Sequence, residues 1–130
     1  MAKLYLHIGL HKTASSSFQL SCAGNHKMLQ KQNIFYPLFH CPGTSHNKIN
    51  NHSIPLFSLY TTRPEAYPIN VHWGIDDIAA INQAYTQQLQ QALECDEDLL
   101  LSGEDIASLE ADELQQLLED LSNSGRELVI

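Results

Sequence analysis

A short apolar run that ends in glycine and leads directly into small polar residues constrains this chain most. Residues 4–9 are mostly apolar, which predicts a buried β-strand. Residues 11–17, His-Lys-Thr-Ala-Ser-Ser-Ser, predict a polar loop, and the apolar residues that follow predict a helix to about residue 31. A strand, a loop and a helix in this order favour an α/β fold with a mainly parallel sheet.

The rest of the chain continues the alternation of strands and helices. Apolar runs at residues 34–36, 99–101 and 126–130 predict three further strands. A chain of 130 residues is large enough for one core, so we expect a single domain over residues 1–130. Because the last element is an apolar strand, we expect a domain truncated at its C-terminus or a strand edge that pairs with a second copy.

The spacing of apolar residues and the capping residues predict the remaining helices. Apolar residues three and four apart predict one helix capped by Asp76 and another capped by Ser108. Residues 123–125, Asn-Ser-Gly, stop the second of these helices. The loop-rich stretch in the middle of the chain contains a third candidate helix across residues 47–60, which Pro55 would interrupt.

Charge is distributed very unevenly along the sequence. Residues 1–64 contain five lysines, one arginine and no Asp or Glu, whereas residues 65–130 contain Arg126 and all fifteen acidic residues. We therefore expect the first half to handle any anionic ligand, and the two halves to attract each other. The net charge of -8 argues against broad nucleic-acid binding.

The sequence also bounds the redox state and the location of the protein. Cys22, Cys41 and Cys95 are widely spaced and form no Cys-x-x-Cys pair, which favours reduced thiols over disulfides. The seven histidines supply no recognised ligand spacing, so no metal is expected. No apolar run approaches the roughly 18 residues that span a bilayer, and the N-terminus has no signal-peptide pattern. We therefore expect a cytoplasmic protein with no membrane partner.

The loop at residues 11–17 has the composition of an anion site. Small residues let successive backbone N–H groups turn inward, and the helix that follows adds unpaired N–H groups and the positive end of its dipole. Lys12 adds a full charge, and the threonine and three serines add neutral donors. The sequence therefore predicts a phosphate or sulfate site, with simple N-capping by the serines as the alternative.

The loop does not have the register of a nucleoside triphosphatase loop. That motif needs a glycine directly before its lysine and another glycine five positions earlier. Here His11 precedes Lys12, and Leu6 stands at the earlier position. ATP or GTP is therefore not the expected ligand.

Residues 7–19, His-Ile-Gly-Leu-His-Lys-Thr-Ala-Ser-Ser-Ser-Phe-Gln, resemble the 5′-phosphosulfate-binding loop of bacterial sulfotransferases that use 3′-phosphoadenosine 5′-phosphosulfate. Members of that family often read HIG-x-[HP]-KTGTTS-x-Q, and the replacements here keep small size and hydroxyl chemistry. Residues 98–104, Asp-Leu-Leu-Leu-Ser-Gly-Glu, resemble the family's strand-then-SxE segment, and residues 127–130 fall where its next strand begins. The family's 3′-phosphate site, an arginine and a serine, would lie beyond Ile130.

The resemblance implies a P-loop-like, three-layer α/β fold and a sulfotransferase activity. The co-substrate would be 3′-phosphoadenosine 5′-phosphosulfate, and the acceptor would be a hydroxyl or amine of a small molecule or glycan, with no metal required. Lys12 would contact the oxygen that bridges phosphorus and sulfur, where negative charge develops. The residues implied to hold the phosphosulfate are His11, Lys12, Thr13, Ala14, Ser15, Ser16 and Ser17.

Sulfuryl transfer also needs a base that takes the proton of the acceptor. Glu104 is the first candidate, because it follows a predicted strand and open parallel sheets place ligand-facing residues beyond the carboxyl ends of their strands. Glu104 could equally begin or cap a helix. His46 and His52 are the alternative bases, since histidine is neutral near pH 7 and both lie in a loop-rich stretch.

A second interpretation assigns binding rather than catalysis. The chain would then be a truncated, non-catalytic module that binds a nucleotide or an anion and forms a homodimer through its C-terminal strand. On the first interpretation the chain is an enzyme if a longer chain or a partner supplies the 3′-phosphate site.

Overall fold

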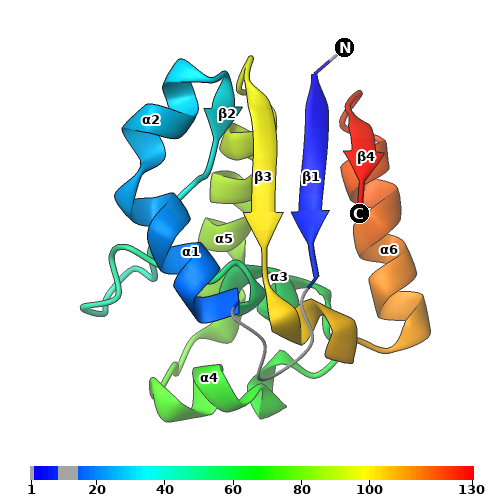
Figure 1. Cartoon of the computed structure of the whole chain (residues 1–130). Coiled ribbons are helices and arrows are strands. Elements are labelled where there is room, and N and C mark those ends of the chain that lie inside the picture. Colours follow the sequence, from blue (N-terminus) through cyan, green and yellow to red (C-terminus); the bar gives the residue numbers. More distant parts are fainter. Residues whose placement is uncertain (1, 9–14) are drawn as a thin grey trace.

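The computed structural model describes residues 2–8 and 15–130 as an α/β fold built on one four-stranded parallel sheet (Figure 1). Its strands lie in the order β2-β3-β1-β4. β1 and β3 pair from Leu4 opposite Leu99 to His7 opposite Ser102. The predicted α/β class and parallel sheet are therefore confirmed. The strands are β1 (Lys3–His7), β2 (Ile34–Phe35), β3 (Asp98–Ser102) and β4 (Glu127–Val129).

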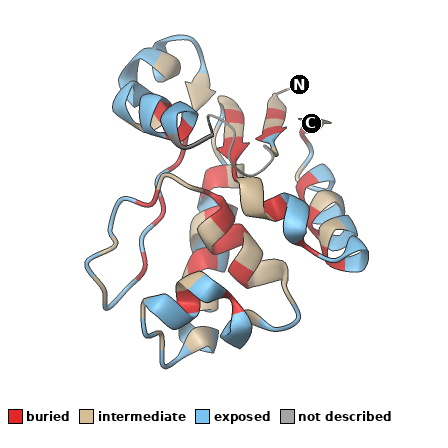
Figure 2. Ribbon diagram, turned by 60° about the horizontal axis from the view of Figure 1, so that its bottom comes forward, coloured by how far each residue is buried: buried red, intermediate tan, exposed pale blue. Residues whose placement is uncertain are grey.

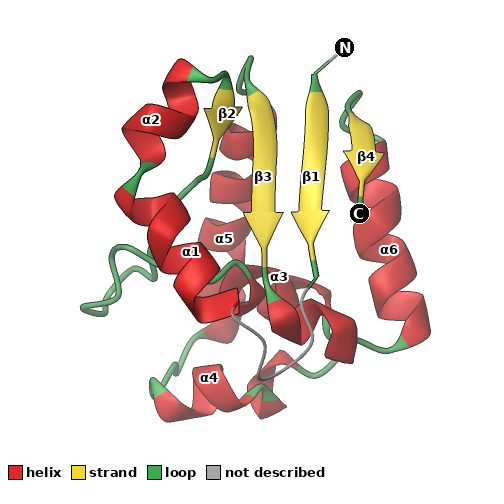
Figure 3. Ribbon diagram, viewed as in Figure 1, coloured by secondary structure: helices red, strands yellow, loops and turns green. Residues whose placement is uncertain are grey.

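Helices occupy the connections between the strands (Figure 3). Two helices lie between β1 and β2, most of the others lie between β2 and β3, and one long helix precedes β4. This alternation gives every strand a parallel neighbour, as a chain that returns through helices must. The helices are α1 (Ser15–Gly24), α2 (His26–Lys31), α3 (Ser53–Tyr60), η1 (Pro64–Ala66), α4 (Pro68–His72), α5 (Ile78–Leu93), η2 (Glu104–Ser108) and α6 (Ala111–Ser122).

The core lies between one face of the sheet and the helices α5 and α6. Alternate residues of β1 and β3 are fully buried, as the two-residue period of a strand requires. Tyr5, on the opposite face of β1, is only half-buried. Figure 2 shows the buried residues gathered in the strands and in the helices packed against them. The main contributors are Leu4, Leu6, Leu99, Leu101, Tyr85, Leu89, Leu117 and Leu121.

The first predicted helix is in fact two helices. α1 ends at Gly24 and α2 begins at His26, with Asn25 between them in a non-helical conformation. The Asn25 side-chain amide donates to the carbonyl oxygen of Ser21 at 2.7 Å. Glycine and asparagine both favour helix ends, because glycine loses the most backbone entropy and asparagine binds nearby backbone groups. The Gly-Asn pair therefore breaks the helix.

Three details of the other helices differ from the sequence prediction. Pro55 does not interrupt α3, because it lies in the first turn, where its missing N–H costs nothing. The cap of α5 is Asp77, not Asp76, and the Asp77 carboxylate accepts from the Ala80 N–H at 3.1 Å. Ser108 does not cap α6, which begins three residues later.

The cap of α6 is formed by two glutamates. Glu110 occupies the N-cap position, and its N–H donates to Glu113 Oε1 at 2.9 Å. Glu113 Oε2 also accepts from the Thr62 N–H at 2.6 Å, so the side chain ties the start of α6 to the end of α3. These two backbone donors lower the pKa of Glu113. A reciprocal cap of this kind replaces the serine that the sequence suggested.

Arg126 is buried, with 8% of its surface exposed, and it holds together the ends of four elements. Its guanidinium donates to the carbonyl oxygens of Leu93 and Cys95, after α5, and of Glu97, before β3, the last at 2.6 Å. It also donates to the carbonyl oxygen of Lys3 in β1 at 3.4 Å. The five N–H donors of a guanidinium suit such a cluster of acceptors. Arg126 therefore supplies donors to carbonyl oxygens at the ends of these elements.

The cysteines and the lengths of the helices bear on two further expectations. Cys22, Cys41 and Cys95 all carry free thiols, as predicted. Within residues 2–8 and 15–130, no helix is long and apolar enough to cross a membrane.

Arg126→Met should lower the free energy of unfolding by about 3 kcal/mol, because several buried carbonyl oxygens lose their donor. Arg63→Met is the matched control, since Arg63 is 78% exposed and its contact with Glu65 at 4.0 Å contributes little. Urea unfolding of both variants measures the difference. Equal losses in the two variants would show that Arg126 does not have this role.

Candidate functional site

The carboxyl ends of β1 and β3 lie side by side at one edge of the sheet (Figure 1). His7, the last residue of β1, places its Nδ1 2.8 Å from the Oγ of Ser102, the last residue of β3. The Gly103 N–H continues the pairing and donates to the His7 carbonyl oxygen at 3.0 Å. His7 is exposed, whereas Ser102 is fully buried. The accessible imidazole of His7 is therefore hydrogen-bonded to the buried Ser102 at the edge where parallel sheets bind ligands.

His7 is linked through Ser102 to α1 as well as to β3. The side-chain nitrogen of Gln19, in α1, lies 3.3 Å from both the carbonyl oxygen and the Oγ of Ser102 and donates to them. The same hydroxyl is hydrogen-bonded to Nδ1 of His7. The His7 ring also lies beside the Phe18 ring, with the two centroids 4.8 Å apart.

His52 is a structural link and is not available as a base. It is fully buried, and its Nδ1 accepts from the Ser102 N–H at 2.9 Å while its Nε2 donates to the Pro37 carbonyl oxygen at 2.6 Å. Burial lowers the pKa of His52 to about 4. Both ring nitrogens are engaged, so no lone pair is left to take a proton from a substrate.

The turn after β3 is packed tightly against the start of α3. Ser53 Oγ accepts from the Asp105 N–H at 2.9 Å. A Cβ atom on Gly103 would lie only 2.4 Å from both the N and the Oγ of Ser53, so no larger residue fits there. The backbone of Gly103 is extended, with φ near -167°, so the glycine is required by space and not by conformation. This close approach brings the α3 start to the site.

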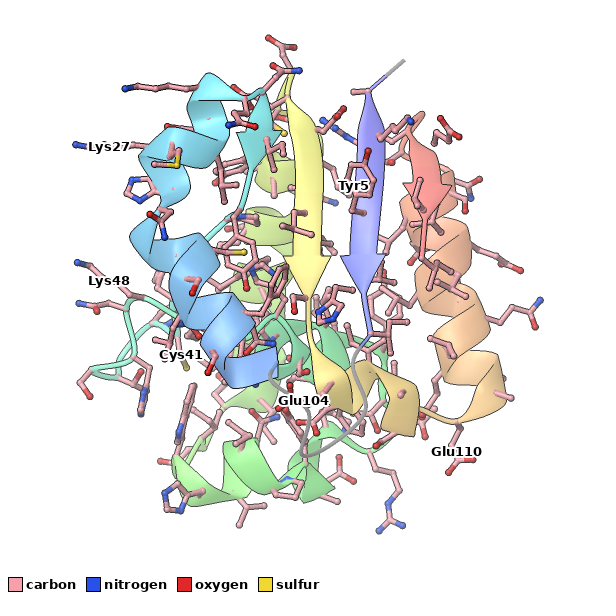
Figure 4. The ribbon with its side chains drawn as sticks, in the orientation of Figure 1. Tyr5, Lys27, Cys41, Lys48, Glu104 and Glu110 are labelled. Carbon is pink, nitrogen blue, oxygen red and sulfur yellow. The ribbon has the colours of Figure 1, made fainter. Side chains whose placement is uncertain are left out.

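Glu104 begins η2, just beyond the carboxyl end of β3 (Figure 4). The sequence left open whether Glu104 is a base or the start of a helix, and it does begin a short helix. Its Oε2 is nevertheless buried and has no hydrogen-bond partner in the part of the chain that the structure describes. Buried polar atoms in proteins are nearly always bonded, so this oxygen is suited to a donor that a ligand brings.

Tyr67 borders the same region. Its hydroxyl donates to Asp105 Oδ2 at 3.1 Å. Burial raises the pKa of Tyr67 well above its usual range, and the neighbouring Asp105 carboxylate raises it further. Tyr67 therefore stays protonated and keeps its hydrogen bond to Asp105.

The structure does not bring His46 to Glu104. His46 lies in the loop between β2 and α3, which projects to one side of the molecule in both Figure 1 and Figure 2. Its ring stacks on Trp73 with centroids 3.7 Å apart and planes within 5° of parallel. The two candidate bases thus occupy different places, and only Glu104 follows the end of β3.

Most of the predicted binding loop lies outside the described residues. This applies to His11, Lys12, Thr13 and Ala14. Ser15, Ser16 and Ser17 form the first turn of α1, which agrees with a loop that leads into a helix start.

Sequence reasoning did not assign His7 or Gln19 a place in the site. Both lie within the segment that carries the family resemblance, and that was the available signal. In the part of the chain that the structure describes, no group of three or more His, Cys, Asp or Glu side chains could hold a metal ion.

Comparisons with known proteins add no family to this description. No protein-family model matches the chain, and no curated protein and no solved structure matches it either. The functional assignment therefore rests on the residues and their geometry.

Because His52 is buried in its neutral form, the free energy of unfolding should fall in mild acid. Its pKa is about 4 in the folded state against 6.5 ordinarily, so the unfolded chain binds the proton first as the pH falls. The contribution of neutral His52 to the free energy of unfolding is complete above pH 6.5. It is lost as the pH falls from 6.5 to about 4, and the total loss is about 3 kcal/mol.

Urea unfolding at neutral pH and near the lower end of that range measures this loss. His52→Gln cannot titrate, so it should lose less of its unfolding free energy over the same interval than the wild type does. A variant with the same pH dependence as the wild type would contradict the assignment.

Proposed function

We propose that the chain holds the 5′-phosphosulfate of 3′-phosphoadenosine 5′-phosphosulfate and transfers its sulfuryl group to a hydroxyl or amine acceptor. The observation that carries this proposal is the buried Oε2 of Glu104, which has no hydrogen-bond partner among the described residues and lies beyond the carboxyl end of β3, next to the strand that leads into the phosphosulfate-like segment. An anion-binding loop and a base at one sheet edge are the two parts that sulfuryl transfer needs.

A P-loop-like, three-layer arrangement is part of the proposal, and the strand order supports it. The connection from β1 to β2 passes β3 in one direction, and the connection from β3 to β4 passes β1 in the other. Right-handed crossovers in opposite directions cover opposite faces of a sheet. In Figures 1 and 2, α1 and α2 lie on one side of the strands and α5 and α6 on the other. Folds of this kind bind ligands beyond the carboxyl ends of the two strands where the connections change direction, which are β1 and β3 here.

Each residue has a distinct role in the proposed reaction. Lys12 neutralises the charge that develops on the bridging oxygen, and the residues from His11 to Ser17 hold the phosphosulfate through backbone and hydroxyl donors. The exposed imidazole of His7 offers a further hydrogen-bonding group at the end of β1. Glu104 accepts the proton of the acceptor as the new S–O bond forms and the bond from sulfur to the bridging oxygen breaks.

The same proposal covers the partners and the location of the protein. The acceptor is a small molecule or glycan, nucleic acid is not a partner, and the cytoplasm is the proposed compartment. The alternative, a non-catalytic anion-binding module, is supported by the position of β4 as an outer strand of the sheet, to which a second copy could add.

Thermal shift with adenosine 3′,5′-bisphosphate, ATP and inorganic sulfate tests the ligand class. A ligand that binds the folded state stabilises it by RT ln(1 + [L]/Kd), so the tighter-binding bisphosphate and sulfate should raise the melting temperature more than ATP at equal concentration. A larger shift with ATP would contradict the proposal. A bisphosphate shift without sulfuryl transfer by the longest natural form of the protein would favour the binding module.

Lys12→Ala should reduce kcat on the order of 10²-fold, the scale of removing one preorganised electrostatic group, and should weaken bisphosphate binding much less. Lys27→Ala is the matched control, because Lys27 lies on the exposed surface of α2 and points away from the sheet (Figure 4). Steady-state kinetics on the longest natural form gives both quantities. Unchanged kcat with collapsed nucleotide affinity would make Lys12 an anchor only.

A further inference from the structure

A separate pocket of about 310 Å³ lies where the loop between β2 and α3 meets Trp73. Its lining mixes polar side chains with the apolar Ile49, Ile54 and Trp73, and no carboxylate belongs to it. Every strand of the sheet runs in the same direction, so this loop leaves β2 at the same sheet edge as the candidate site. The principal lining residues are His46, Asn47, Lys48, Asn50, Asn51 and Trp73.

The loop that forms the pocket is held by its own backbone. Phe39 and Ile49 form an antiparallel bridge with N–H to O distances of 3.1 and 2.7 Å. The Cys41 N–H donates to the His46 carbonyl oxygen at 2.8 Å, and the Tyr36 hydroxyl donates to the Asn50 carbonyl oxygen at 2.5 Å. These bonds use backbone atoms of the pocket residues and leave their side chains to face a ligand.

The side chains of the pocket are of two kinds: a pair of stacked rings, and polar groups without a hydrogen-bond partner among the described residues. The stacked rings of His46 and Trp73 form one wall. Among the described residues, the side chains of Asn47, Asn50 and Lys48 form no hydrogen bond or ion pair. Lys48 extends outward from the loop (Figure 4), which places its charge at the rim.

We propose that this pocket binds a sugar ring. Each asparagine amide both donates and accepts, which matches neighbouring hydroxyls, and flat aromatic walls pack against the apolar faces of a sugar. The rim ammonium and the lack of a carboxylate favour an acidic or neutral sugar over an amino sugar.

Hydrogen bonds at the start of α3 link the pocket to the turn that carries Glu104. Asn51 Oδ1 accepts from the Ser53 N–H at 3.0 Å, and Ser53 Oγ accepts from the Asp105 N–H at 2.9 Å. We assign the sugar to the acceptor, an assignment that rests on the proposed function. The binding of the sugar stands independently of it.

Trp73 is the only tryptophan of the chain, so its fluorescence reports this pocket directly. Titration with glucuronate, methyl glucoside and glucosamine should change the emission with Kd values on the order of millimolar, tightest for glucuronate. Asn47→Ala combined with Asn50→Ala should weaken binding about tenfold or more, as expected for lost ligand hydrogen bonds. Gln87→Ala, on the exposed side of α5, is the control and should leave binding unchanged.

The outcomes separate this inference from the proposed function. No response to any sugar, a response only to adenosine, or sugar binding that survives the double asparagine variant would overturn the pocket assignment. If adenosine 3′,5′-bisphosphate still binds in those cases, the proposed function is unaffected. Sugar binding without bisphosphate binding would support the pocket and overturn its role as an acceptor site.

Discussion

Ser102 is the residue on which the candidate site depends. Its N–H donates to His52, its carbonyl oxygen accepts from the His52 N–H at 2.8 Å and from Gln19, and its hydroxyl contacts His7. One small, fully buried residue thereby joins β1, β3, α1 and the start of α3. Fully satisfied polar groups in a low-dielectric interior hold such elements in one arrangement.

Close packing around Ser102 determines what the neighbouring residues can do. Gly103 leaves no room for a side chain against Ser53, so the chain turns there and places Glu104 at the sheet edge. His52 must remain neutral because its proton serves Pro37 and its lone pair serves Ser102. His46 and His52, the two alternative bases of the sequence, thus separate into a wall of a pocket and a buried link, and the exposed histidine at the sheet edge is His7.

Local elements were largely predictable, and their ends were less so. Apolar runs marked all four strands, because an apolar strand buried in a parallel sheet needs no partner information to be recognised. The caps were missed where a long-range contact or a reciprocal pair decided them: Glu113 caps α6 while also binding Thr62. Pro55 was misjudged because the start of α3, set by the contact of His52 with Ser102, puts it in the first turn.

The sequence alone determined the order of strands and helices, the uneven charge and the family-like segment at residues 7–19, since each depends only on residues near one another in the chain. Tertiary structure alone decided which side chains meet. His7 and Ser102 are 95 positions apart, and only the parallel register of β1 and β3 brings the imidazole to the hydroxyl. The pocket at Trp73 likewise combines a loop and a distant helix end, because hydrogen bonds and packing act across space and leave no local pattern in the sequence.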